Sequence, residues 1–321
     1  MEKKLFSSFA GKFLKKHVSH GGEAPDGSHG MMLYLEGINK SFDGFKAIND
    51  LNLYIEKGEL RCIIGPNGAG KSTTIRTLLG LIAPTSGSAQ VLGKDIISER
   101  REILRSVGYL PSEATFYPGM RVSEVLKLSA DLRGQDCSAE AKALCDRLQL
   151  DTAGKVDELS FGNRKKVAIV CALQSCPPLL ILDEPTGGLD PLMQRAFFEI
   201  IRERNRAGAT VFLSSHVLSE VQRNCTRAAV IREGRIIACG SIEELAKSSA
   251  KRVTVHGTAE LGGLDGVKDC KTVDGAVSFL YNGDINRLLA RLSVSAIDDL
   301  SITEPDLEEI FLHFYEKEDM T

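Results

Sequence analysis

The sequence predicts an α/β fold, a layered core in which strands alternate with helices. Three observations support this fold class. Strand-like and helix-like runs alternate between residues 60 and 216. A glycine-rich phosphate-binding pattern joins the first of these strands to a helix. Residues 179–182 form a continuous apolar run, which is typical of a strand buried on both faces, as in a parallel sheet.

Composition limits the possible classes of protein. A chain of 321 residues with 43% hydrophobic content can bury a large core, and its length suggests two domains or one large domain with an appendage. No apolar run reaches the roughly 18 residues that cross a bilayer, so we expect any membrane role to depend on a partner chain or on surface attachment. The net charge of −3 argues against nucleic acid as the main partner. Eight cysteines without a C-x-x-C pair favour reduced, mostly buried thiols.

Residues 1–30 differ in character from the rest of the chain. Apolar residues recur there at helical spacing, and five lysines lie within the same short segment. One hypothesis is a basic amphipathic helix on an anionic membrane surface. The alternative is a poorly ordered extension. Residues 21–30 are rich in glycine and predict a flexible linker.

The folded part is expected to begin near Met32. Residues 33–38 and 47–55 alternate as two strands, with Gly44 in the turn between them. They predict an antiparallel β-layer beside the core. Phe42 lies between the two strands.

The phosphate-binding pattern G-x-x-x-x-G-K-[ST] follows the apolar strand 60–64 and precedes a helix. It consists of Gly65, Pro66, Asn67, Gly68, Ala69, Gly70, Lys71, Ser72 and Thr73. We expect the three glycines to adopt positive φ and to let the backbone wrap around phosphate oxygens. Lys71 would reach the β- and γ-phosphates, and the Ser72 hydroxyl is placed to ligate Mg²⁺. The alternative, a glycine-rich turn with a surface lysine, is disfavoured by the strand and helix on either side.

The next part of the chain predicts an inserted α-helical subdomain over residues 112–170. A charged helix at 96–105 and a strand at 106–110 come before it, and residues 122–150 are mostly helical in pattern. Ser160 can cap the helix that follows.

Two acidic residues and a histidine follow apolar strands. Asp183 and Glu184 come directly after residues 179–182, and His216 follows the strand 210–215. We expect Asp183 to bind Mg²⁺, Glu184 to orient or deprotonate an attacking water, and His216 to donate a hydrogen bond to a γ-phosphate. The alternatives are a solvated acidic turn and a structural histidine.

The character changes again near residue 251. Short strands at 252–256, 276–281 and 296–302, with helices at 285–292 and 305–317, predict a small α+β domain over residues 250–321.

The order and spacing of these motifs resemble the ABC ATPase family. The resemblance rests on residues 65–73, the signature Leu159-Ser160-Phe161-Gly162-Asn163, the acidic strand 179–184, the D-loop at 187–190, and His216. It covers residues 33–242 and implies a P-loop NTPase core of ABC ATPase type, an ATP-binding domain over residues 31–245. The tail at 306–311 is similar to that of ATPase subunits of ABC-2 type exporters.

The resemblance also implies partners and a shared site. ATP would bind between two such chains in a homodimer or heterodimer, with Phe42 stacking on adenine. Ser160 and Gly162 would reach the γ-phosphate on the other protomer, and Asp190 belongs to the D-loop. A separate transmembrane permease is implied, with this chain cytoplasmic and peripheral on the inner face of the membrane.

Two departures from the family pattern stand out. Ser112 occupies the position of a glutamine that senses Mg²⁺ and couples to the permease. Serine is too short to reach as far, so either Glu113 or a bridging water takes its place. In the signature, Phe161 replaces a glycine and Asn163 a glutamine, whereas Ser160 is retained.

The sequence therefore predicts the ATP-hydrolysing subunit of an ABC exporter. The alternative is a soluble ABC ATPase that acts on nucleic acid or ribosomes. Such proteins usually have two cores, long coiled-coil insertions or basic tracts, and this chain has a single core. A non-hydrolysing regulatory subunit would lack the catalytic acid, yet Glu184 is present.

Overall fold

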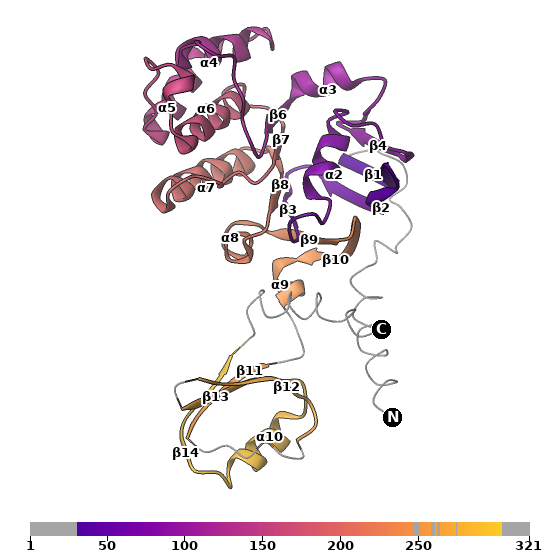
Figure 1. Cartoon of the computed structure of the whole chain (residues 1–321), viewed down its shortest axis with the longest axis vertical. Helices are drawn as coiled ribbons and strands as arrows, with labels where there is room; N and C mark the ends of the chain where they lie inside the picture. Colours follow the sequence, from indigo (N-terminus) through magenta and orange to yellow (C-terminus); the bar gives the residue numbers. More distant parts are fainter. Residues whose placement is uncertain (1–30, 247–250, 258–260, 262–263, 274, 304–321) are drawn as a thin grey trace. The chain divides into compact units, whose positions relative to one another are not determined.

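The computed structural model describes residues 31–246, 251–257, 261, 264–273 and 275–303. The chain divides after Gly240 into two compact units (Figure 1). Our predictions of an amphipathic helix within residues 1–30 and of a helix at 305–317 lie outside the described residues.

The first unit is built on a six-stranded sheet in the order β10-β9-β3-β8-β7-β6. Its strands are β3 (Leu60–Ile64), β6 (Val107–Leu110), β7 (Leu179–Leu182), β8 (Thr210–Ser215), β9 (Arg227–Arg232) and β10 (Arg235–Ser241). The neighbours from β9 to β6 pair in parallel. Every residue of β3, β7 and β8 is buried. This arrangement confirms the α/β fold class.

Parallel pairing brings the predicted site residues to one edge of this sheet. Ile64 pairs with Ser215, and Leu182 pairs with Leu213. The carboxyl ends of β3, β8 and β7 therefore lie side by side. The phosphate-binding loop, His216 and the two acidic residues each follow one of these ends.

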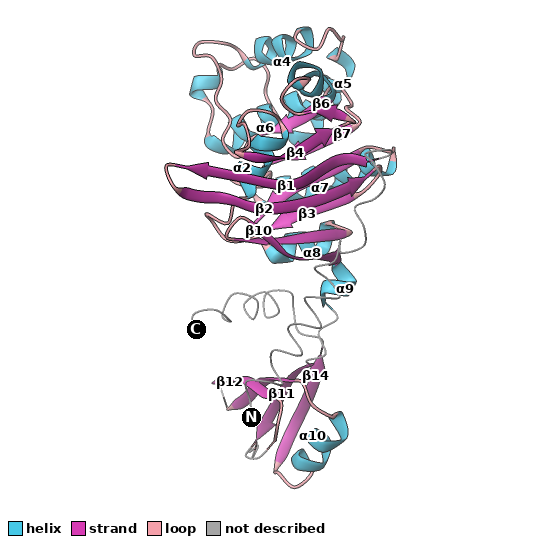
Figure 2. Ribbon diagram, turned by 90° about the vertical axis from the view of Figure 1, so that its right-hand side faces the viewer, coloured by secondary structure: helices cyan, strands magenta, loops and turns pink. Residues whose placement is uncertain are grey.

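A second sheet of the first unit has the order β2-β1-β4-β5 and pairs antiparallel (Figure 2). Its strands are β1 (Met31–Phe42), β2 (Phe45–Glu56), β4 (Ser86–Val91) and β5 (Lys94–Asp95). The predicted antiparallel pair is confirmed, and both strands are longer than predicted. Asp43 and Gly44 have positive φ, as a two-residue hairpin turn requires. Strand β4 was not predicted, because its small and polar residues give no apolar alternation.

Helix α2 (Lys71–Leu78) packs between the two sheets. The other helices of this unit are α3 (Arg100–Ser106), α4 (Val122–Asp131), α5 (Ser138–Leu148), α6 (Phe161–Leu173), α7 (Pro191–Arg206) and α8 (Leu218–Asn224), with a 3-10 turn η1 (Val156–Glu158). Helices α4 and α5 pack against α6 (Figure 1). All three lie within or next to the range 112–170 that we predicted to be a helical subdomain.

The predicted start of α3 at residue 96 is wrong. The Asp95 carboxylate accepts hydrogen bonds from the N–H groups of Ile97 and Ser98, at 3.1 and 2.8 Å. Such a side-chain turn competes with helical hydrogen bonding, so the helix begins only at Arg100. The same bonds lower the pKa of Asp95.

The second unit contains a sheet with the order β12-β13-β11-β14, in which neighbours pair antiparallel. Its elements are α9 (Ile242–Ala246), β11 (Lys251–Gly257), β12 (Val267–Val273), β13 (Ala276–Tyr281), α10 (Ile285–Leu292) and β14 (Ile297–Thr303). Leu288 and Leu292 of α10 pack with Val253 and Phe279 of the sheet. The predicted strands and the helix at 285–292 are present. Polar β12 was missed.

All eight cysteines lie within the described residues, and none of them forms a disulfide. Cys62, Cys137, Cys145 and Cys225 are buried, whereas Cys176 and Cys270 are exposed. No helix among the described residues combines the length and the apolar character that crossing a bilayer requires.

Strand β6 and helix α6 approach each other unusually closely. A Cβ atom added at Gly108 of β6 would lie 2.3 Å from the carbonyl oxygen of Ala172 on α6. Real Cβ atoms do not approach backbone oxygens so closely, so only glycine allows this packing.

We therefore expect Gly108→Ala to lower the free energy of unfolding by about 1–3 kcal/mol, because helix and strand must move apart. The matched control is Gly154→Ala, since a Cβ atom there meets nothing within 4 Å. Urea denaturation of both variants tests the expectation. Equal stabilities would show that the contact at Gly108 is not tight.

Candidate functional site

A cavity of about 500 Å³ lies at the carboxyl edge of the central sheet. It is lined by Phe42, Phe45, Ala47, Asn67, Gly68, Gly70, Lys71, Ser72, Thr73, Ser112, Glu184, Gly187 and His216. Both phenylalanines come from the β1–β2 hairpin and are exposed by 43% and 66%. The cavity therefore combines an aromatic wall with a glycine-rich loop and charged groups.

The phosphate-binding loop has the expected left-handed glycines at two of three positions. Gly68 and Gly70 have φ values of +82° and +106°. Our expectation of positive φ at Gly65 is wrong. Glycine is needed there for another reason, because a Cβ atom would lie 2.4 Å from the carbonyl oxygen of Ile231.

Lys71 begins α2 and is 5% exposed. Its ammonium donates to the carbonyl oxygens of Gly65 at 2.7 Å and Pro66 at 3.1 Å. It also lies 3.3 Å from Glu184 Oε1. The ammonium of Lys71 is thus held between the loop carbonyls and Glu184. Ala69 of the loop is buried.

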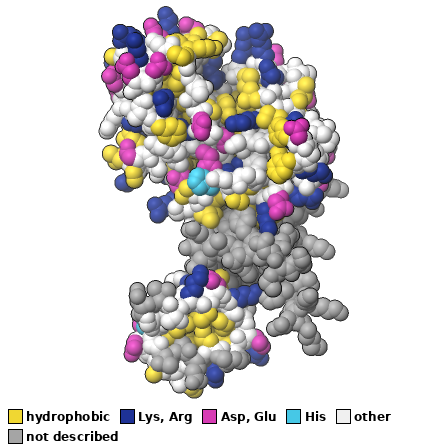
Figure 3. All heavy atoms as spheres, in the orientation of Figure 1, with side chains coloured by type: hydrophobic (Ala, Val, Ile, Leu, Met, Phe, Trp, Pro, Cys, Tyr) yellow, Lys and Arg dark blue, Asp and Glu magenta, His cyan; other side chains and the backbone are white. Residues whose placement is uncertain are grey.

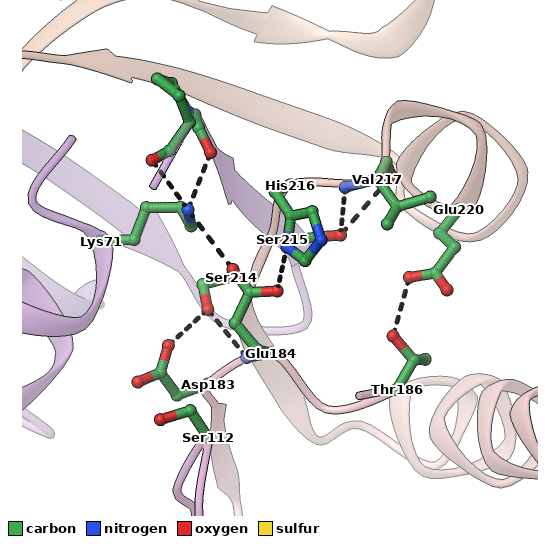
Figure 4. A network of polar contacts seen from close by, with 12 residues as sticks. Lys71, Ser112, Asp183, Glu184, Thr186, Ser214, Ser215, His216, Val217 and Glu220 are labelled. Carbon is green, nitrogen blue, oxygen red and sulfur yellow. Dashed lines mark hydrogen bonds and ion pairs between the residues drawn. The ribbon is translucent and has the colours of Figure 1, made fainter. Parts of the chain in front are cut away.

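The Asp183 carboxylate is fully buried beneath the cavity. Its Oδ1 accepts a hydrogen bond from the Ser72 hydroxyl at 3.1 Å. It accepts a second one from the Ser214 hydroxyl at 2.6 Å (Figure 4). Oδ2 has no hydrogen-bond partner among the described residues. One buried carboxylate oxygen therefore remains available for a cation.

Glu184 lies between two basic side chains. Its Oε2 is 2.6 Å from His216 Nδ1, and its Oε1 faces Lys71 (Figure 4). Glu184 has a left-handed φ of +47°, and its N–H donates to the Ser214 hydroxyl at 2.9 Å. This turn directs Glu184 into the cavity although Asp183, one residue earlier, is buried below it.

Ser160, Gly162 and Asp190 do not line this cavity. Ser160 caps α6 by accepting a hydrogen bond from the Asn163 N–H at 3.3 Å, and Asp190 caps α7 by accepting from two N–H groups at 3.0 Å. The two turns touch, since a Cβ atom at Gly162 would lie 2.6 Å from the carbonyl oxygen of Gly188. They form a separate surface, on which Phe161 is 49% exposed.

Several residues of the site were not predicted from the sequence. Phe45 is a second aromatic residue on the cavity wall, and Ser214 binds both acidic positions. Glu220 accepts a hydrogen bond from Thr186 at 2.9 Å, and burial raises its pKa. Ser112 lines the cavity, whereas Glu113 is exposed and outside the lining. Among these residues, only Ser214 could have been found from the sequence, because it lies near the end of the strand that precedes His216.

Comparisons with known proteins agree with this geometry. Residues 48–187 match the family model described as ABC transporter. The chain is 33% identical to the uncharacterized ABC transporter ATP-binding protein YhaQ of Bacillus subtilis, over 88% of this chain and 97% of that protein. It is 32% identical to the Nod factor export ATP-binding protein I of Burkholderia thailandensis, over 88% of this chain and 96% of that protein.

A solved structure described as the ATP binding subunit of an ABC transporter superposes with a TM-score of 0.64. It is 31% identical, and the match covers 67% of this chain and 92% of that one. The P-loop core, the second sheet and the helices around α6 are thus those of an ABC cassette. The chain belongs to the ABC transporter ATP-binding proteins and is an ATPase subunit of that family.

Proposed function

We propose that the chain binds MgATP in the cavity at the carboxyl edge of the sheet and hydrolyses it with Glu184 as the general base. The observation that carries this proposal is the position of Glu184 between Lys71 and His216 on the cavity wall. The phosphate-binding loop lies beside it, so a γ-phosphate on the loop would lie next to the base.

The chemistry follows from these positions. Lys71 and the amides of the loop and of the α2 N-terminus stabilise the charge that develops on the phosphoryl oxygens. Glu184 accepts a proton from the attacking water, and the contact with His216 orients its carboxylate. Phe42 and Phe45 offer faces on which the base of the nucleotide stacks.

Asp183 and Ser72 are the residues that would hold Mg²⁺. The unbonded Oδ2 of Asp183 and the neighbouring Ser72 hydroxyl are hard oxygen donors of the kind that Mg²⁺ prefers. Among the described residues no group of three His, Cys, Asp or Glu side chains could bind a metal by itself. The phosphates are therefore expected to complete the coordination. Mg²⁺ would supply charge neutralisation at the β- and γ-phosphates.

The surface formed by Ser160, Gly162 and Asp190 supports a dimer. These residues lie outside the cavity of their own chain, and the N-terminus of the 13-residue helix α6 favours an anion. Two chains arranged head to tail would each present this surface to the nucleotide of the other. We assign the homodimer or heterodimer on this basis.

We further propose that the dimer powers export through a separate membrane permease, on whose cytoplasmic side it lies as a peripheral subunit. The name of the Nod factor relative supports export. A groove of about 780 Å³ between α3, α4 and residues 115–120 is our candidate for the permease contact. Tyr117 and Leu132 in it are 72% and 69% exposed. The segment that forms one wall follows Ser112, which lines the nucleotide cavity.

The face of the first unit that Figure 3 shows gives no support to the nucleic-acid alternative. On the face shown in Figure 3, Lys and Arg side chains of the first unit are interspersed with acidic and apolar groups.

We retain residues 31–245 as the ATP-binding domain and residues 250–321 as a C-terminal domain.

Replacing Glu184 by Gln is expected to retain MgATP binding and to lower turnover by about 10²- to 10⁴-fold, because the amide keeps the shape and loses the base. Phosphate release and nucleotide binding are measured on the same preparation. Undiminished ATPase activity would remove Glu184 from its assigned role.

Ser214→Ala removes a donor to Asp183 and the acceptor for the Glu184 N–H. We expect ATPase activity, titrated with Mg²⁺, to fall by about 10- to 100-fold, as for other groups that orient a metal ligand. Ser215→Ala is the control, because that hydroxyl accepts a hydrogen bond from the Val217 N–H instead. Similar activities of the two variants would contradict the role of Ser214.

The shared site is tested by mixing two variants, both with Glu184→Gln to stop hydrolysis. Lys71→Ala and Ser160→Arg should each prevent ATP-driven dimerisation when every chain carries them. A mixed dimer combines both defects in one site and leaves the other intact, and one bridging nucleotide favours the dimer by mass action. Sedimentation with MgATP should show more dimer in the mixture. No gain over the separate variants would place the whole site within one chain.

A further inference from the structure

Lys165 is a buried cation without a role in the site described above. It is 2% exposed and lies in the second turn of α6. Its ammonium donates to the carbonyl oxygens of Pro111 at 3.0 Å and Ser112 at 2.9 Å. Burial lowers its pKa to about 8, while Asp183, Glu184 and Glu113 act in the opposite direction. Burying an ammonium is costly, so a neutral residue would serve better if only packing mattered.

The two carbonyl groups belong to the segment that follows β6, and one of its residues, Ser112, lines the nucleotide cavity. Pro111 and Ser112 directly follow β6, and Ser112 lines the cavity together with Lys71, Glu184 and His216. Five residues before Lys165, Ser160 caps the N-terminus of the same helix. Lys165 thus connects the cavity wall to α6, the helix whose N-terminal turn contains Ser160 and Gly162.

A second contact makes this connection rigid. Gly108 of β6 touches the backbone of α6 at Ala172. Along the helix, Lys165 and Ala172 are about 10 Å apart. Gly108 lies within β6, whereas Pro111 and Ser112 follow the end of that strand. Two contacts at this separation fix both the distance and the angle between helix and strand. A displacement of Ser112 therefore carries α6 with it.

We propose that Lys165 is a positioning residue for ATP hydrolysis. It fixes the position of the Ser112 segment, which lines the nucleotide cavity of its own chain, relative to the Ser160 turn. In the proposed dimer, that turn faces the nucleotide of the partner chain. This inference rests on the proposed function. The hydrogen bonds from Lys165 hold the Ser112 segment by its backbone carbonyls, whereas the short side chain at position 112 does not hold it.

The test compares Lys165→Met, which keeps the length and loses all donors, with Lys165→Arg, which keeps a cation with N–H groups. Lys166→Met is the matched control, because the neighbouring lysine is only half-buried. We expect Lys165→Met to retain its melting temperature and its KM for MgATP, and to lower kcat by about 10- to 100-fold, as a displacement of about 1 Å does. Lys165→Arg should recover part of kcat, and Lys166→Met should resemble the unchanged protein.

A pH profile gives an independent readout that does not require the arginine variant to fold. With a pKa of about 8, Lys165 is charged below that pH and loses its charge and one N–H donor above it. The kcat of the unchanged protein should therefore fall as the pH rises through about 8, and this step should be absent in Lys165→Met.

Three results would overturn the proposal: an unchanged kcat in Lys165→Met, a rise in KM alone, or a fall in kcat that only follows a fall in melting temperature. Failure of the proposed function is recognised separately. In that case the unchanged protein hydrolyses no ATP, or Glu184→Gln hydrolyses it undiminished.

Discussion

The buried carboxylate of Asp183 is the constraint on which the rest of the site depends. A charge that is fully withdrawn from water must be hydrogen-bonded, and the donors come from α2 and from β8, the strand between β3 and β7. The Ser214 hydroxyl that donates to Asp183 also accepts from the Glu184 N–H. One hydroxyl therefore fixes an acid below the cavity and helps to hold the next residue in the left-handed conformation that directs it into the cavity.

Sequence reasoning succeeded where burial leaves a repeating pattern. The apolar runs of β3 and β7 and the alternation in β1 and β2 predicted their strands. Strands β4 and β12 are made largely of small or polar residues, so their place is set by pairing with neighbours and not by their own pattern. The start of α3 depends on one side chain, Asp95, which competes with the helix for backbone N–H groups.

The same distinction holds for the site. Residues of the phosphate-binding loop and the acidic pair are contiguous in the sequence and follow strands, so their meeting at one edge was predictable. Ser214 and Lys165 act on groups 31 and 53 residues away. The only local signal for Ser214 is its place near a strand end, and the local sequence of Lys165 gives none. Gly65 illustrates a subtler limit. The motif predicts a glycine at this position. The reason that only glycine fits is the close approach of the Ile231 carbonyl oxygen, which depends on the neighbouring strand β9.

The arrangement around Lys71 indicates how binding and hydrolysis are linked. Its ammonium is shared between two loop carbonyls and Glu184, and Glu184 is shared between Lys71 and His216. In the mechanism that we propose, phosphate oxygens on the loop would compete for the three N–H groups of Lys71, because they are stronger acceptors than neutral carbonyls. If Lys71 turned to the phosphate, Oε1 of Glu184 would be free to accept a hydrogen bond from water while Oε2 stayed on His216. The proposed base would then become available beside the γ-phosphate.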